Sequence, residues 1–301
     1  MKNLIYYPNF ESRDLNWLKF ALIYLENFSP IIPHSGEGFI SDLYRQLKNE
    51  TDLLLIHQPD YGQGNRATKK AIDYVTKVIQ NPHSYIDDLN SMNAVREWKN
   101  PENQTYTLFE EKFVGEWRWF CKENKFVQDS PYGLQISQNL GEVYMTFLAQ
   151  EVAYEEEASP ITDKKYLDDL SISIRTKNVT NDNKIEVAKS VIEHQLPLDF
   201  RQIDINEIIK IRNKPGFKTK QLAFHSELNK TYESIGKAIE PSKFIDSYNR
   251  TLKDWTGELT KYGIGAVTCG LSAYILLQND LATNPEYAKQ ILEAGLILMG
   301  V

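Results

Sequence analysis

The opening of the chain, LIYYPNFESRDLNWLKFALIYLENFSPIIP, constrains the fold more than any other segment. Its apolar pattern predicts a strand at residues 4–7, then a helix, then a second short strand at the sequence IIP. Asn16, Lys19 and Glu26 interrupt an otherwise apolar helix, so nearly every face of this helix must be covered by protein. Because strand–helix–strand units usually build parallel sheets, we expect this segment to form the centre of a domain.

The same alternation continues after this segment. Residues 38–50 have the apolar spacing of a second helix, and residues 52–57 (DLLLIH) form a continuous apolar run of strand length. Further along, a helical stripe over residues 140–152 leads into SPITDKKYLDDL, which we interpret as a strand followed by a helix. This order predicts an α/β domain over residues 1–175, with a small parallel sheet flanked by helices.

The rest of the chain has a different character. The aromatic-rich residues 108–126 predict one continuous helix, and residues 132–137 predict a strand. From about residue 180 onward the apolar spacing is that of long helices, which predicts a mainly α-helical domain over residues 176–301.

An uncharged run near the C-terminus, residues 262–277, leaves two interpretations open. A membrane span needs about 20 apolar residues, and this run is shorter, which favours a buried C-terminal helical hairpin. Small residues at Gly263, Ala266, Gly270 and Ala273 would also let another helix approach closely. The alternative is therefore a hairpin that inserts into a membrane or assembles with other copies.

Composition narrows the class of protein. The 301 residues are 42% hydrophobic and 25% charged, as in ordinary globular proteins. The formal net charge of −7 argues against a general nucleic-acid-binding protein. Cys121 and Cys269 stand far apart without neighbouring metal ligands, and the apolar run at residues 4–7 is too short for a secretory signal. We therefore expect a cytoplasmic protein that needs no metal and no cofactor.

Asp163 is the strongest candidate for a catalytic residue. In the sequence SPITD, Thr162 and Asp163 follow a predicted strand and open a predicted helix, so the carboxylate stands at the carboxyl end of the sheet. The segment resembles the late helix–strand–Thr-Asp segment of the PIN-domain ribonucleases, which implies a metal-dependent nuclease. Those enzymes also carry an acid on the first strand, where this chain has Tyr6, Tyr7 and Pro8. The alternative is that Thr162 caps the helix and Asp163 stabilises its positive end.

Four further residues are candidates for ligand binding. Tyr6 and Tyr7 end the first predicted strand, Tyr144 lies on the helical stripe over 140–152, and Arg212 belongs to a run without acids between Lys210 and Lys220. A basic run of this kind is either a site for phosphate or an acidic partner, or a solvated helix end.

Several short segments in a fixed order resemble a bacterial family, domain-of-unknown-function family 6236. They are YYP with WLK and the later IIP, then GEGFI, then YMTFLAQEVA running into PITD, and last LPLDF with IIKIRNK. The resemblance implies a prokaryotic intracellular protein and no particular activity.

Three functions follow from these features. The first is a non-enzymatic module that binds a protein partner or ligand at the strand ends and assembles as a homo-oligomer, within a phage-defence or stress system. The second is a divergent nuclease centred on Asp163, and the third is a membrane-acting effector that uses the C-terminal hairpin.

Overall fold

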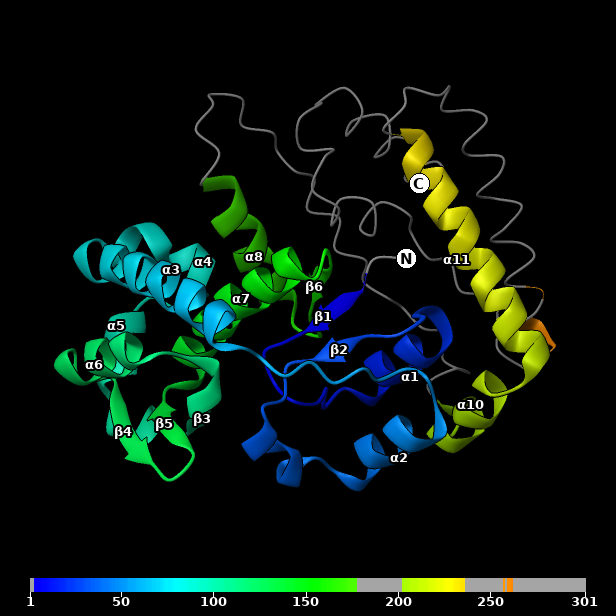
Figure 1. The fold of residues 1–301 in the computed structure, drawn as a ribbon. Coiled ribbons are helices and arrows are strands. Elements are labelled where there is room, and N and C mark those ends of the chain that lie inside the picture. The colour runs from blue at the N-terminus through cyan, green and yellow to red at the C-terminus, as the bar shows by residue number, and fades with distance from the viewer. Residues whose placement is uncertain (1–2, 178–201, 236–256, 258, 262–301) are drawn as a thin grey trace.

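The computed structural model describes residues 3–177, 202–235, 257 and 259–261 (Figure 1). Its strands are β1 (Leu4–Tyr6), β2 (Ser29–Pro30), β3 (Tyr106–Phe109), β4 (Val127–Ser130), β5 (Gly133–Ile136) and β6 (Ser159–Ile161). Its helices are α1 (Leu15–Tyr24), α2 (Asp42–Glu50), α3 (Tyr61–Gln80), α4 (Ile86–Leu89), α5 (Ala94–Lys99), α6 (Gly115–Glu123), α7 (Gln138–Glu155), α8 (Lys165–Lys177), α10 (Ile205–Arg212) and α11 (Pro215–Ile235). Four short 3₁₀ helices join them: η1 (His34–Phe39), η2 (Pro82–Tyr85), η3 (Pro101–Asn103) and η4 (Glu110–Lys112).

The central sheet is parallel, with the strand order β2-β1-β6. Residues 53–57 run beside β2 in the same direction, through parallel bridges from Phe28 to Leu54 and from Ile31 to His57. The backbone N–H of His57 donates to the carbonyl of Pro30 over 3.0 Å. The predicted parallel arrangement of the first three strand segments is therefore confirmed, and with it the α/β fold in which a small parallel sheet is flanked by helices.

Side chains of β1 alternate between two hydrophobic cores, one on each face of the sheet. Leu4 and Tyr6 pack in one core with side chains of α1, α2 and α10. Ile5 and Tyr7 pack in the other with side chains of α3, α7 and α8. Figure 1 shows these two groups of helices on opposite sides of the sheet, so the domain has three layers.

Helix α1 is buried on almost every side, as its composition predicts. Asp14 caps its N-terminus by accepting from the backbone N–H groups of Asn16 and Trp17. All of its residues from Leu18 to Tyr24 are buried, including Lys19. The sheet covers one side of this helix, and α10 packs against another.

The prediction of one continuous helix over residues 108–126 is wrong. Leu108 and Phe109 lie in β3, which pairs with β5 in an antiparallel sheet of order β3-β5-β4, and the helix α6 begins only at Gly115. A short apolar run has no periodicity that distinguishes strand from helix, so the pairing with β5 decides its conformation. The strand predicted at residues 132–137 is confirmed as β5.

Residues from the predicted helical domain belong to the core of the α/β domain. Ile208 and Ile209 of α10 and Phe217 of α11 are buried in the same core as Leu4 and Leu22. These described residues of α10 and α11 therefore pack against the α/β domain. The predicted C-terminal hairpin lies outside the described residues. None of the described helices combines the length and the apolar character that crossing a membrane requires.

Candidate functional site

Asp163 lies at the carboxyl end of β6 and is joined there to the segment that follows β1. Its Oδ2 accepts a hydrogen bond of 2.6 Å from the hydroxyl of Ser12. The backbone N–H of Ser12 donates to the hydroxyl oxygen of Tyr44, on α2, over 2.7 Å. Tyr6, at the end of β1, completes the group. We call these four residues, Tyr6, Ser12, Tyr44 and Asp163, the strand-end cluster.

Two polar atoms in the strand-end cluster are buried without a hydrogen-bond partner among the described residues. They are the hydroxyl of Tyr6 and Oδ1 of Asp163. Burial raises the pKa of Tyr6 far above its ordinary value, and the negative charge of Asp163 raises it further. Burial also raises the pKa of Tyr44. Both phenols therefore stay protonated at any physiological pH and can act as hydrogen-bond donors.

A second carboxylate, Glu142 of α7, lies behind β6 and is fully engaged. It is buried, and it forms an ion pair with Lys164 and accepts hydrogen bonds from Tyr166 and Gln138. Within the described ranges no three His, Cys, Asp or Glu side chains come together in a way that would hold a metal ion. The two further carboxylates that the nuclease hypothesis places beside Asp163 are thus not found in this part of the chain.

Thr162 forms a local hydrogen bond in the turn before α8. It is buried, and its hydroxyl oxygen accepts the backbone N–H of Lys164 over 3.2 Å, just before α8 begins. Thr162 therefore orders the turn that presents Asp163.

The four predicted ligand-binding residues are not brought together. Tyr6 is in the strand-end cluster, whereas Tyr7 points to the opposite core and donates to the carbonyl of Leu167 over 3.1 Å. Tyr144 is buried on α7, and its hydroxyl donates to the carbonyl of Lys112 over 2.8 Å.

Arg212 is 1% exposed at the carboxyl end of α1. Its Nη1 donates to the carbonyls of Leu22 and Leu25, over 2.6 and 2.9 Å, and its Nε donates to Asp52 over 3.0 Å. The last carbonyl groups of a helix have no partner within the helix, and here a guanidinium supplies one. These contacts give Arg212 a structural role in joining α10 to α1.

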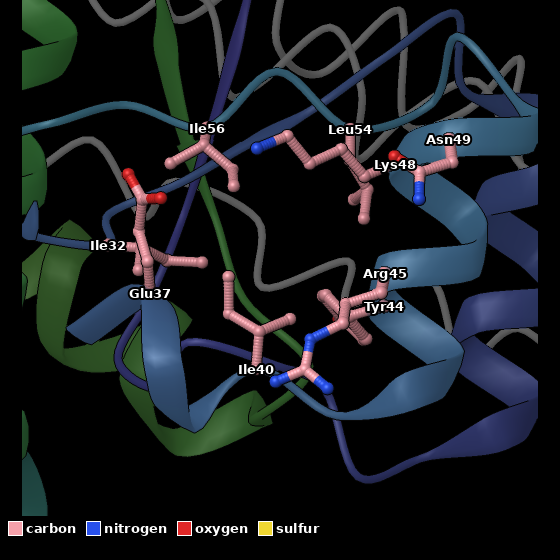
Figure 2. Close-up of a pocket in the computed structure, with 9 residues that line it drawn as sticks. All are labelled: Ile32, Glu37, Ile40, Tyr44, Arg45, Lys48, Asn49, Leu54 and Ile56. Carbon is pink, nitrogen blue, oxygen red and sulfur yellow. The ribbon is translucent and has the colours of Figure 1, made fainter.

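A pocket of about 190 Å³ opens beside the strand-end cluster, between α2, η1 and the edge segment 53–57 (Figure 2). Tyr44 belongs to both, because its ring lines the pocket and its hydroxyl belongs to the cluster. The lining residues are Ile32, Glu37, Ile40, Tyr44, Arg45, Lys48, Asn49, Leu54 and Ile56.

The pocket has an apolar floor and a charged rim. Ile32, Ile40 and Leu54 are buried, whereas Glu37, Arg45 and Lys48 are exposed. Figure 2 shows Lys48 extending from α2 across the pocket and Glu37 on the opposite wall. The combination of hydrocarbon below and separated charges above is typical of a site for a small polar molecule.

Sequence reasoning missed this pocket. Tyr44 and Lys48, and likewise Arg45 and Asn49, are four positions apart on α2, so the four residues share a face of the helix. Their spacing was a signal, but the opposite wall comes from the edge segment and η1, which only the folded sheet brings close.

Comparison of the chain with models of protein families, with curated proteins and with solved structures finds no match. The resemblance to domain-of-unknown-function family 6236 stays a prediction. What the fold defines is a three-layer α/β protein with a pocket at the edge of its parallel sheet.

Proposed function

We propose that this chain is a binding protein whose pocket holds a small polar molecule beside the strand-end cluster. The observation that carries the proposal is the pocket itself, with an apolar floor of Ile32, Ile40 and Leu54 and charged groups of both signs at its rim. In α/β proteins, ligands usually bind near the carboxyl ends of parallel strands.

The chemistry of the neighbouring residues supports binding over catalysis. Asp163 is held by the hydroxyl of Ser12, and the raised pKa values of the Tyr6 and Tyr44 phenols keep both protonated, so neither phenolate is available as a general base. Glu142 is neutralised by Lys164. Of these groups Tyr44 lines the pocket, and its hydroxyl accepts the backbone N–H of Ser12, which holds this wall in place before a ligand binds.

The wider setting of this function is also a proposal. A cytoplasmic, prokaryotic protein that takes part in a phage-defence or stress system, and that assembles with a partner or with its own copies, is consistent with the resemblance described above. The membrane-acting alternative rests on residues 262–301, which lie outside the described part of the chain.

The test uses the full-length protein and a panel of small molecules: amino acids, mono- and dicarboxylates, sugars and nucleotides. Each is added in excess while the midpoint of thermal unfolding is measured, because a ligand that binds the folded state raises it. The variant Ile56→Trp places a large ring in the pocket. Its matched control is Leu55→Trp, because adjacent strand residues point to opposite sides and Leu55 is 47% exposed.

We expect at least one class of compound to raise the midpoint for the original protein and for Leu55→Trp, but not for Ile56→Trp. Cooperative unfolding of Ile56→Trp, followed by circular dichroism, shows that the variant is folded. The proposal is overturned if no class raises the midpoint, or if Ile56→Trp responds as strongly as the control.

A further inference from the structure

The rim of the pocket carries opposite charges on opposite walls, and this arrangement limits which ligands can bind there. Arg45 and Lys48 lie on α2, three residues apart, and Glu37 lies on η1 across the opening (Figure 2). From these positions, and resting on the proposed function, we infer that the pocket binds a small aliphatic amino acid in its zwitterionic form.

The two cations of the rim differ in how far they are already engaged. Nη1 of Arg45 donates to Asp42 over 3.0 Å, and Nη2 donates to the carbonyl of Gly38 over 3.4 Å. Lys48 forms no ion pair with any carboxylate in the described ranges. With respect to the described residues, Lys48 therefore supplies a positive charge without a paired carboxylate above the apolar floor, and a ligand carboxylate is the group that would neutralise it.

Glu37 supplies the complementary group. Its Oε1 accepts from Nε2 of Gln58 over 2.8 Å, which fixes the side chain at the rim. A carboxylate held in this way attracts an ammonium group and repels a second carboxylate. A dicarboxylate is therefore disfavoured, and a molecule that carries one amine and one carboxylate meets both walls.

The volume of the pocket and its apolar floor determine the uncharged part of the ligand. A volume of about 190 Å³ is small for a ligand site, since such sites usually measure about 300–1,000 Å³. This space favours a small molecule and is sufficient for a short hydrocarbon chain. Ile32, Ile40 and Leu54 would contact that chain, and its transfer from water supplies the non-directional part of the binding free energy.

Three probes with the same branched hydrocarbon chain test the inference: L-leucine, 4-methylpentanoate, which lacks the amine, and 3-methylbutylamine, which lacks the carboxylate. Binding is measured by titration calorimetry with the full-length protein. We expect L-leucine to bind at least about fivefold more tightly than either analogue, as partly exposed ion pairs allow.

Two variants test which charged group of the ligand Lys48 and Glu37 each bind. Lys48→Gln should weaken binding of L-leucine and of 4-methylpentanoate, whereas Glu37→Gln should weaken binding of L-leucine to the level of the acid and leave the acid unchanged or tighter. Lys69→Gln, an exposed lysine on α3, is the control and should change neither.

The outcomes separate this inference from the proposed function. If 4-methylpentanoate binds as tightly as L-leucine, and Ile56→Trp abolishes binding of both compounds, the inference of a zwitterionic ligand is wrong and the pocket remains a binding site. If none of the three probes binds but another class in the panel does, the inference also fails while the proposed function stands. If nothing in the panel binds, both are overturned.

Discussion

The hydroxyl of Ser12 donates to the carboxylate of Asp163 over 2.6 Å, although 151 positions separate the two residues in the sequence. This bond joins the segment after β1 to the segment after β6, at the carboxyl end of the sheet. Ser12 also donates its backbone N–H to Tyr44, whose ring lines the pocket. The hydrogen bonds of one serine therefore connect the carboxylate of Asp163 to a wall of the binding site.

Removing the Ser12 hydroxyl should destabilise the protein. In Ser12→Ala, Oδ2 of Asp163 loses its donor in a site where Oδ1 already lacks one, so the free energy of unfolding should fall by about 1–3 kcal/mol. Urea unfolding measures this change. Ser226→Ala, at an exposed serine of α11, is the control and should stay within about 0.5 kcal/mol. Equal stability of the two variants would show that the bond to Asp163 carries no net free energy.

Lys112 should make stability depend on pH. Its side chain is 1% exposed, its Nζ lies 3.7 Å from Sδ of Met145 and 4.6 Å from the centre of the Phe10 ring, and burial lowers its pKa to about 7. Glu111 opposes this shift only in part. Because the unfolded chain holds the proton up to a pKa of about 10.5, the cost of the buried charge is full below pH 7 and decreases as the pH rises toward 10.5.

The variant Lys112→Met removes this cost. Relative to the variant, the original protein should gain about 1.4 kcal/mol of unfolding free energy per pH unit between about pH 7 and 10. Urea unfolding of both proteins at several pH values measures the difference. Lys69→Met, at an exposed lysine, should show no such slope. A difference between Lys112→Met and the original protein that is constant with pH would contradict the lowered pKa.

Arg212 should be among the most costly residues to replace outside the pocket. In Arg212→Met the carbonyls of Leu22 and Glu26 lose their donor, whereas the Leu25 carbonyl keeps Gln221 and the half-exposed Asp52 keeps Lys218. We therefore expect a loss of about 1–3 kcal/mol in unfolding free energy. Arg96→Met, at an exposed arginine of α5, should change it by less than about 0.5 kcal/mol. The prediction fails if chemical unfolding gives both variants the same midpoint.

Gly133 should tolerate no side chain. Its φ is +149°, and an added Cβ would lie 2.2 Å from the carbonyl oxygen of Leu108 on the paired strand. Gly133→Ala should therefore lower the free energy of unfolding by more than about 1 kcal/mol, through backbone strain and the loss of β3–β5 pairing. At Gly115 an added Cβ meets no atom within 4 Å, so Gly115→Ala is the control. Calorimetric unfolding of the pair gives the comparison.

The sequence by itself determined the elements whose patterns are local. The helix α1 and the strand segment at residues 53–57 both follow from the residues present, because burial on all sides gives a nearly continuous run of apolar residues. The parallel direction of the first strands followed as well, since a helix between two strands returns the chain to the same edge.

Tertiary structure alone decided which of these elements meet. Residues 108 and 109 became a strand because β5 was available to pair with them, and Arg212 became buried because α10 packs on the end of α1. Likewise, Glu37 and Lys48 face each other across a pocket only because η1 and α2 pack over the edge of the sheet. Contacts between distant segments depend on how the faces of helices and sheets pack against one another, and no local pattern of residues predicts that packing.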